Sequence, residues 1–358
     1  MKISLTIVFL FFVYYAGSAQ DVQYTDAKAL TLYGRSAVSG PHFHRVDTAR
    51  YNDMPKHVKV LATYPAGLAI AFKTDSKEIY GRWRIKHGRS YKNMTMIASR
   101  GLDLYIKRDG QWVFAGAGVP GDTVTTHKIV GNMADGKKEC LLFLPTYDEL
   151  LELAVGVEKG SYVRPLTIEW KGKIVIYGSS ITQGASASRP GMAYPAQLSR
   201  RLGYEIVNLG FSGSGKMEES VGRMVADAGA DLFILDCAAN PSPQEILDRT
   251  ENFVKQIRVK HPGVPILMIE SVVREGGNFD QKIQKRVWDQ NNNFRRMHAK
   301  LVQEGMEKLY LINGDDLLGH DHEGTVDGTH PNDLGFDRML QVIEPKVRAI
   351  LTGNYPTE

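Results

Sequence analysis

The sequence predicts two folds in series: an all-β sandwich or jelly roll, followed by an α/β domain built on a doubly wound parallel sheet. Short apolar or alternating runs separated by turn signals fill the chain from about residue 24 to about residue 165, and no convincing helical period interrupts them. Beyond residue 172, unbroken apolar runs alternate with helical patterns, which is typical of a parallel sheet covered on both faces. The two patterns meet at PLTIEWKG (165–172). We therefore expect a β-domain over residues 20–168 and an α/β domain over residues 169–358.

The first residues have the three parts of a secretory signal peptide. Lys2 supplies the basic start, residues 3–15 are nearly all apolar, and AGSA (16–19) is a small-residue cleavage site. The apolar core is too short for a comfortable membrane span, and no cysteine follows the cleavage site to carry a lipid anchor. No later segment is long and apolar enough to cross a bilayer. We expect cleavage after Ala19 and an exported protein, either periplasmic or secreted.

The composition argues against several classes of function. Charged residues make up 23% of the chain and the net charge is only +4, so the sequence lacks the basic patches that nucleic acid or an anionic membrane requires. Cys140 and Cys237 are the only cysteines and fall in different halves of the chain. We expect both to be buried free thiols, with a disulfide between them as the alternative in an oxidising compartment, and we expect no cofactor.

The first half carries its strand signal in residues 70–85, 101–116 and 137–157, which contain turn signals such as RDG (108–110). Five aromatic residues are expected mainly in the core, with a sugar-stacking surface as the alternative: Tyr33, Trp83, Tyr105, Trp112 and Tyr147. His42 and His44 would share one face of an extended strand, as metal ligands do, but no third ligand lies near them in the sequence.

The second half alternates strands and helices. Strand-like runs occur at residues 174–177, 206–209, 232–235, 264–269 and 309–312. Helical patterns occur at residues 194–202, 218–228, 243–259, 287–305 and 334–351. Short connections and right-handed crossovers turn this order into a flavodoxin-like doubly wound sandwich, whose sites form at the carboxyl ends of the strands.

Polar residues follow the strands at that edge. KIVIYGSSITQG (173–184) carries Ser180 into a small-residue turn, which on its own fits a plain strand-to-loop junction equally well. Three later stretches follow other strands: NLGFSG (208–213), DCAAN (236–240) and VDGTHP (326–331). The carboxyl edge of the predicted sheet thus brings together a hydroxyl, a glycine-rich turn, an amide and an Asp/His pair.

This set of groups is what acyl transfer requires. Ser180 would attack a carbonyl carbon, and His330 would take the hydroxyl proton and later return it to the leaving group. Asp327 can reach the imidazole Nδ1 through a single turn and favour the required tautomer. The backbone N–H groups of Ser180 and Gly213 and the side-chain amide of Asn240 would stabilise the oxyanion.

At these residues the chain resembles a known family, the SGNH (GDSL-type) hydrolases. The four blocks of that family map in order onto Gly178–Ile181, residues 208–213, Ala238–Pro241 and Asp327–His330. The resemblance covers roughly residues 173 to 351 and implies a carboxylic ester hydrolase with the roles assigned above. In addition, GLDLY (101–105) resembles the GxDLY signature of a β-domain that precedes SGNH-type esterases in many secreted bacterial proteins.

Two departures from the family pattern bear on the site. Ser179 stands where many members carry aspartate, and this difference affects no catalytic role. The GxND block keeps only its asparagine, Asn240, and this residue has an alternative role as the cap of the helix that begins near Pro243.

A polar cluster and a polar helix lie outside this set. The cluster comprises Asp315, Asp316, His320, Asp321, His322 and Glu323. It fits either a metal site or a solvated active-site loop, and no H-x-x-x-H helix supports the metal. Six residues are expected to form a helix with one polar face: Trp288, Asn291, Asn292, Asn293, Arg295 and Arg296.

The leading hypothesis is an exported serine esterase that removes acetyl or other short acyl groups from a polysaccharide or an acylated small molecule. A lipase or thioesterase on the same triad is the alternative among enzymes, although the connection at residues 237–244 is short for a lid. A glycan-binding protein with a decayed hydrolase domain and a metallohydrolase are the alternatives from other classes.

Overall fold

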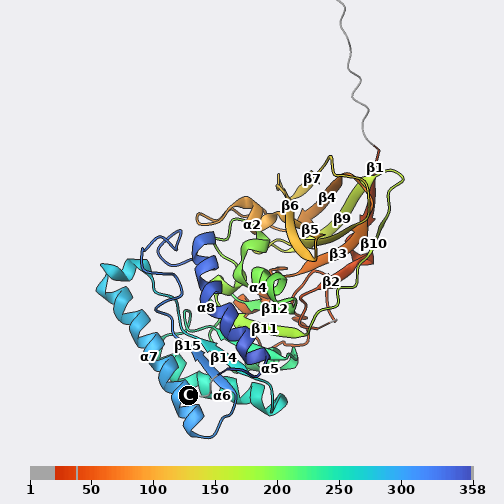
Figure 1. Cartoon of the computed structure of the whole chain (residues 1–358). Coiled ribbons are helices and arrows are strands. Elements are labelled where there is room, and N and C mark those ends of the chain that lie inside the picture. The colour runs from red at the N-terminus through yellow and green to blue at the C-terminus, as the bar shows by residue number, and fades with distance from the viewer. Residues whose placement is uncertain (1–20, 38, 356–358) are drawn as a thin grey trace, which may run out of the picture.

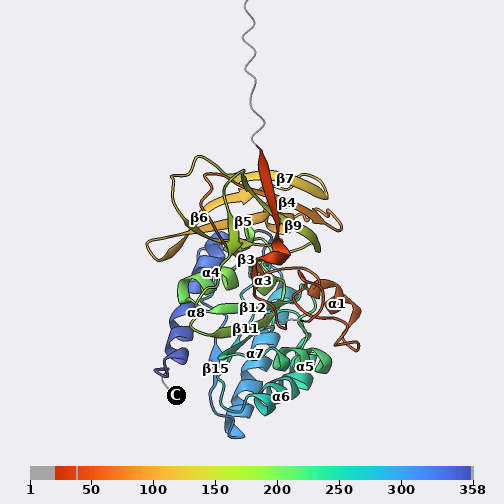
Figure 2. The same cartoon turned by 90° about the vertical axis from the view of Figure 1, so that its right-hand side faces the viewer.

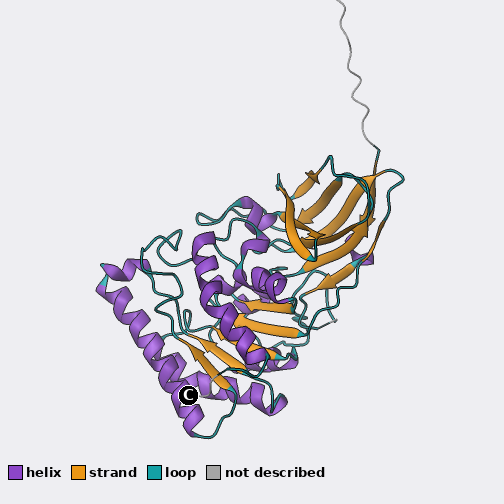
Figure 3. Ribbon diagram, viewed as in Figure 1, coloured by secondary structure: helices purple, strands orange, loops and turns teal. Residues whose placement is uncertain are grey.

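The computed structural model describes residues 21–37 and 39–355, so the signal peptide predicted at residues 1–19 lies outside the described residues. Two antiparallel sheets form the N-terminal part of the chain, and a parallel sheet flanked by helices forms the C-terminal part (Figure 1, Figure 3). This arrangement confirms the predicted fold class. The division between residues 168 and 169 stays a prediction.

The N-terminal sheets pack face to face as a β-sandwich. The four-stranded sheet has the order β1 (Val22–Asp26), β9 (Leu150–Glu158), β4 (Ile79–Ile85), β7 (Val124–Val130). The six-stranded sheet has the order β10 (Val163–Pro165), β3 (Ala69–Thr74), β8 (Lys138–Phe143), β5 (Leu102–Arg108), β6 (Gln111–Gly118), and β2 (Thr31–Tyr33) also pairs with β3. Phe72, Trp83, Leu104 and Val155 are among the buried side chains that fill the space between the sheets. Their burial is the main stabilising contribution to the sandwich.

Part of the outer face of the six-stranded sheet is buried as well. Leu142 of β8 belongs to the sandwich core, whereas Leu141 and Phe143 pack with Ala196 of helix α4 (Tyr194–Leu202). Because both faces of β8 are covered, this strand has an unbroken apolar run in place of an alternating pattern.

Two short helices occur in the N-terminal half, where the sequence indicated none, and that expectation is wrong. They are α1 (Lys56–Ala62) and α2 (Met96–Arg100), and a 3₁₀ turn, η1 (Ala27–Ala29), precedes β2. Each helix spans two turns at most, which is too short for a 3.6-residue period to stand out. The Thr95 hydroxyl caps α2 by accepting the N–H of Ala98.

The C-terminal sheet is parallel, with the order β12 (Glu205–Gly210), β11 (Lys173–Gly178), β13 (Leu232–Asp236), β14 (Ile266–Ile269), β15 (Leu309–Ile312). One face packs against α5 (Glu219–Asp227), α6 (Pro243–Lys260) and α7 (Gln281–Gln303), and the other against α4 and α8 (Asp333–Leu351). The strand order is the predicted flavodoxin-like one, which places the carboxyl end of β11 at the topological switch point.

A segment of the N-terminal half packs on the C-terminal sheet. Val46, Tyr51 and Met54, together with α1, join the same core as α5, and Figure 2 shows α1 beside α5. The guanidinium of Arg45 is fully buried and donates to the carbonyl oxygens of Asn208 (2.9 Å) and Gly210 (2.8 Å). Burial lowers the pKa of Arg45 to about 9, so the side chain remains charged at neutral pH. It therefore ties this segment to the end of β12.

Several smaller predictions can be compared directly with the structure. Cys140 and Cys237 are buried and free, as predicted. Trp83, Tyr105 and Tyr147 are buried, as the core interpretation requires, whereas Tyr33 and Trp112 are only partly buried. Within the described ranges, no helix is long and apolar enough to cross a membrane.

Candidate active site

Ser180 is presented by a tight turn at the end of β11. It is the first residue of α3 (Ser180–Gln183), and the Ser179 hydroxyl caps this helix by accepting the N–H of Ile181. Gly178 must be a glycine, because an added Cβ would lie 1.9 Å from the Thr182 Oγ1. The turn therefore packs closely on the strand and holds the serine at the edge of the sheet.

Ser180, His330 and Asp327 form one chain of hydrogen bonds. The Ser180 Oγ lies 2.9 Å from the His330 Nε2, and the His330 Nδ1 lies 2.8 Å from the Asp327 Oδ2. The other oxygen of Asp327 accepts the backbone N–H groups of Thr329 and His330. Burial works to raise the pKa of Asp327, but these bonds and the imidazole hold it below its usual value, so the carboxylate is ionised. This is the geometry that general-base activation of a serine requires.

Three N–H groups around the Ser180 side chain have no acceptor within the described part of the chain: the backbone N–H groups of Ser180 and Gly213 and the Nδ2 of Asn240. The Asn240 Oδ1 accepts the N–H of Gly215 at 3.1 Å, which fixes the orientation of the amide and leaves its Nδ2 free to donate. Gly213 has a φ of 67°, a conformation that glycine adopts without strain. Free donors of this kind are what an oxyanion hole needs.

The alternative role of Asn240 as a helix cap is wrong. Helix α6 is capped by Ser242, whose side chain accepts the N–H of Glu245, and Glu245 accepts the N–H of Ser242 in return. This reciprocal pair satisfies the first turn of the helix and leaves Asn240 outside it.

Asn93, in the loop before α2, is a site residue that the sequence did not indicate. Its Nδ2 donates to the Asp327 Oδ2 at 3.0 Å and lies 3.3 Å from the His330 Nδ1. Its carbonyl oxygen accepts the hydroxyl of Ser186 at 2.9 Å, which anchors the loop to the C-terminal half. The N-terminal half therefore contributes a side chain to the Asp–His pair.

Asn93→Ala is expected to lower kcat roughly tenfold while leaving KM nearly unchanged, because Asp327 loses one of its donors but the surroundings of the acyl group stay intact. Asn93→Asp is expected to lower kcat further, since a second carboxylate would repel Asp327. Steady-state kinetics on p-nitrophenyl acetate would test both variants, with thermal unfolding as a check on folding. Equal kcat values for the two variants would contradict this role.

Tyrosines of the N-terminal half line the same region. The Tyr147 hydroxyl lies 3.5 Å from the carbonyl oxygen of Ser180. Tyr91 packs edge-on against Tyr147, with ring centroids 5.2 Å apart, and donates to its carbonyl oxygen. Burial raises the pKa of Tyr147, and it raises that of Tyr91 to about 12, so both hydroxyls stay neutral. They provide an apolar wall with polar tips beside Ser180.

A buried carboxyl group lies beneath the turn that carries Ser180. Asp236, at the end of β13, accepts hydrogen bonds from the hydroxyls of Thr182 (2.7 Å) and Tyr194 (2.9 Å). Burial raises its pKa to about 6, although both hydroxyls oppose this shift.

Because the folded-state pKa of Asp236 exceeds the unfolded value, the wild type loses stability as pH rises from about 4 to about 7, and the loss persists above that range. Asp236→Asn lacks this loss. The free energy of unfolding of Asp236→Asn, minus that of the wild type, is therefore expected to increase by about 3 kcal/mol between those pH values. Urea unfolding of both proteins across this range would test the prediction, and a difference that stays constant with pH would contradict it.

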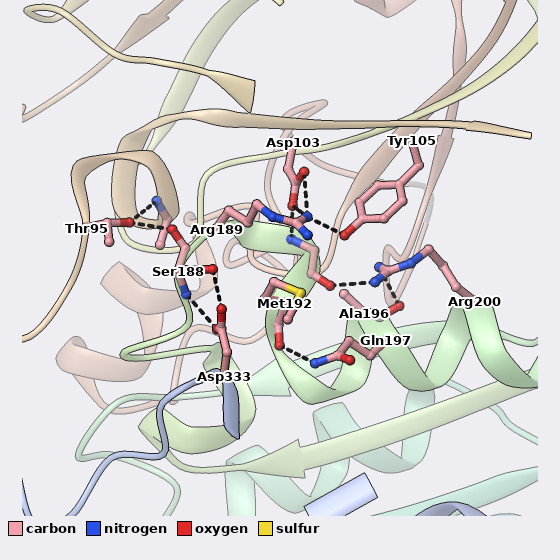
Figure 4. A network of polar contacts seen from close by, with 12 residues as sticks. Thr95, Asp103, Tyr105, Ser188, Arg189, Met192, Ala196, Gln197, Arg200 and Asp333 are labelled. Atoms are coloured by element: carbon pink, nitrogen blue, oxygen red, sulfur yellow. Dashed lines mark hydrogen bonds and ion pairs between the residues drawn. The ribbon is translucent and has the colours of Figure 1, made fainter. Parts of the chain in front are cut away.

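The GxDLY motif contacts the loop that follows α3 (Figure 4). The Arg189 Nη1 donates to both oxygens of Asp103, at 3.0 and 2.9 Å, and the Gly191 N–H donates to the same carboxylate at 2.7 Å. The Asp103 side chain is fully buried, and Tyr105 also accepts from Arg189. The aspartate and tyrosine of the motif thus join the two halves of the chain.

The same loop is connected to the residues just after His330 (Figure 4). Ser188 donates its backbone N–H to Asp333 at 2.9 Å, in the first turn of α8, and its carbonyl oxygen accepts the Thr95 hydroxyl at 2.6 Å. These bonds hold together the β-sandwich, the loop after α3 and the start of α8. Asp333, the first residue of α8, lies only three positions after His330 in the sequence.

The metal alternatives find no support in the geometry. Across residues 21–37 and 39–355, no three His, Cys, Asp or Glu side chains are placed to share an ion. His44 pairs with Glu149 at 2.9 Å, His322 pairs with Glu275 at 2.8 Å, and Asp321 pairs with Arg338. In the polar cluster at residues 315–323, His320, Asp321 and His322 thus each have a separate partner and do not surround a common point.

Comparison with known proteins identifies the family. Residues 171–348 match the GDSL-like lipase/acylhydrolase family, and residues 22–163 match the GxDLY family, described as the N-terminus of SGNH-hydrolase-type esterases. A candidate GDSL-like lipase from Bacteroides ovatus, known from a crystal structure, is 53% identical over 93% of this chain and 98% of its own, with a TM-score of 0.91. The chain belongs to the GDSL-like lipase/acylhydrolase family. It is therefore a carboxylic ester hydrolase.

More distant structures share only the fold with this hydrolase. A salicylyl-acyltransferase from a tetracycline biosynthetic pathway is 20% identical over 94% of this chain and 99% of its own, with a TM-score of 0.75. An acetyl xylan esterase from Butyrivibrio proteoclasticus is 12% identical over 92% of this chain and 99% of its own, with a TM-score of 0.55. No curated protein matches the sequence.

Proposed function

We propose that this hydrolase removes acetyl or other short acyl groups from carbohydrates, through an acyl-enzyme on Ser180, after export and cleavage behind Ala19. The observation that carries the mechanism is the chain of hydrogen bonds from the Ser180 Oγ through the His330 imidazole to Asp327. An oxygen nucleophile, a base in reach of its proton and an ionised group that orients the base are the parts required.

The reaction proceeds in two halves. The Ser180 Oγ attacks the acyl carbon while the His330 Nε2 takes its proton, and the imidazolium then protonates the departing sugar oxygen. In the second half, His330 removes a proton from water, which attacks the acyl-enzyme, and the carboxylic acid leaves as Ser180 is reprotonated. The N–H groups of Ser180 and Gly213 and the Asn240 amide stabilise both tetrahedral oxyanions.

Two observations favour a short acyl group on a carbohydrate. Only residues 237–242 join β13 to α6, so this connection is too short to form a lid over a long acyl chain. One protein of the same fold is named an acetyl xylan esterase, which makes acetylated polysaccharide the first substrate class to test. The alternatives are a lipid or thioester hydrolase on the same triad and a glycan-binding protein without turnover.

Hydrolysis of p-nitrophenyl esters from acetate to octanoate, with acetate release from acetylated xylan measured alongside, separates these functions. Fast acetate turnover together with acetate release from the polysaccharide is the expected result. A preference for octanoate would favour a lipid substrate. Binding of xylan without turnover of any ester would favour the glycan-binding protein.

A further inference from the structure

A cleft lies on the side of the parallel sheet away from the β-sandwich, where Figure 1 places α7. It has a volume of about 240 Å³ and lies between η3 (Glu275–Asn278) and α7. Its polar and aromatic lining includes Arg274, Asn278, Trp288, Asn292, Arg295 and Asp315. None of these residues has a role in the acyl transfer proposed above.

Arg274 connects the cleft to both sides of the candidate active site. Its Nη2 donates to the carbonyl oxygen of Ala239 at 2.7 Å, next to the oxyanion donor Asn240. The N–H of the following residue, Glu275, donates to the carbonyl oxygen of Gly328 at 2.8 Å, next to Asp327. A ligand in the cleft would therefore lie beside the loops that hold the reacting groups.

The guanidinium of Arg274 is half-buried and forms no ion pair with any described carboxylate. The nearby charge that acts on it is another cation, the exposed Arg286, and burial together with this repulsion lowers the pKa of Arg274. By contrast, the neighbouring Arg295 is held by the fully buried Glu270, with N–O distances of 2.9 and 3.0 Å. Asp315 lines the cleft but is not paired with Arg274. A partly desolvated cation without a counter-charge favours binding of an anion.

The cleft also offers a surface for a sugar ring. Trp288 is 64% exposed although it is a large aromatic side chain, and Asn292 lies one turn further along the same face of α7. An exposed indole can pack against the C–H face of a pyranose, and an amide beside it can bond to hydroxyl groups. The aromatic ring and the unpaired guanidinium thus lie in one cleft.

We propose that this cleft is a subsite for an acidic sugar of the acylated glycan, with a uronate carboxylate on Arg274 and its ring on Trp288. This inference rests on the proposed function, because it names the glycan class that the esterase acts on. The carboxylate belongs to the sugar and not to the acyl group, because the surface that would contact a pyranose adjoins the cation.

The test compares kcat/KM for acetate release from acetylated oligogalacturonate and from acetylated xylo-oligosaccharide of equal length. The wild type is expected to prefer the uronate substrate, and Arg274→Gln to reduce this preference about tenfold to a hundredfold. Arg286→Gln, at an exposed site, is expected to reduce it several-fold, and Trp288→Ala to raise KM for both substrates. Arg296→Gln, on the same helix but outside the cleft, serves as the matched control and is expected to keep the preference.

Equal kcat/KM of the wild type on the two substrates would overturn the subsite, as would a preference that survives in Arg274→Gln. A third substrate, a neutral xylo-oligosaccharide that carries a succinyl group, tests where the carboxylate belongs. If Arg274→Gln lowered kcat/KM for this substrate alone, the carboxylate would belong to the acyl group, and the sugar assignment would be overturned. Acetate release from the neutral substrate that depends on Ser180 would still support the proposed esterase. A failure of the subsite proposal can therefore be distinguished from a failure of the proposed esterase function.

Discussion

Ser180→Ala is expected to lower kcat on p-nitrophenyl acetate by about 10⁴-fold or more, with little change in KM. The hydroxyl that lies 2.9 Å from the His330 Nε2 would be gone, whereas the walls of the site would remain. Triad residues act as a unit, so losing the nucleophile removes the acyl-enzyme route and leaves only catalysis by the oxyanion donors and by binding. Steady-state assays at several enzyme concentrations would measure the residual hydrolysis rate of Ser180→Ala.

Ser214→Ala provides the matched control for this loss. Ser214 lies in the glycine-rich turn at the same edge of the sheet, and its backbone N–H, which the variant keeps, donates to the carbonyl oxygen of Phe211. We expect its kcat to stay within about threefold of wild type. Comparable rates for Ser180→Ala and wild type would remove Ser180 from the mechanism.

Arg189→Met is expected to lower the free energy of unfolding by about 3–5 kcal/mol, because it removes the cation that is hydrogen-bonded to the fully buried carboxylate of Asp103. The Gly191 N–H would remain as a single donor to that carboxylate. Adding Asp103→Asn to Arg189→Met should recover more than half of the loss, since an amide oxygen can still accept the Gly191 N–H without carrying a charge. Urea unfolding at neutral pH measures all three proteins.

Lys285→Met is the control for removal of an exposed cation. Lys285 pairs with Asp289 one turn along α7 and is 74% exposed, so its loss should cost less than about 1 kcal/mol. If Arg189→Met destabilised the protein no more than Lys285→Met, the Asp103–Arg189 pair would not be a significant link between the two halves of the chain.

The C-terminal fold was predictable because its signals are local and long. Each buried strand is an unbroken apolar run, and the predicted helix at residues 194–202 agrees with α4 to the residue. The N-terminal half was harder to predict, since α1 and α2 are too short to show a period and both faces of β8 are buried.

In the candidate site, the residues that follow strands of the parallel sheet were predictable from the sequence. The residue that reaches the site from the N-terminal half was not. Ser180, Asp327 and His330 lie at the carboxyl ends of strands or just before the last helix, which topology brings together. Asn93 is separated from Asp327 by 234 positions and lies in a loop with no motif of its own. Only the packing of the β-sandwich on the second half brings the two residues into contact.

The GxDLY motif shows the same limit. Its resemblance to a known signature indicated the kind of domain but not what Asp103 and Tyr105 do. Their role depends on Arg189, which lies 86 residues beyond Asp103 and is unremarkable in the sequence. A buried aspartate in a strand is explained only when its partner is known.

The most direct test of Ser180 as the nucleophile is covalent labelling with paraoxon, followed by intact mass measurement, peptide mapping and a parallel assay of ester hydrolysis. We expect a single phosphoryl adduct on Ser180 that forms in proportion to the loss of activity and is absent from Ser180→Ala. Inactivation with the adduct on another residue, or full activity with Ser180 completely modified, would contradict the acyl-enzyme mechanism.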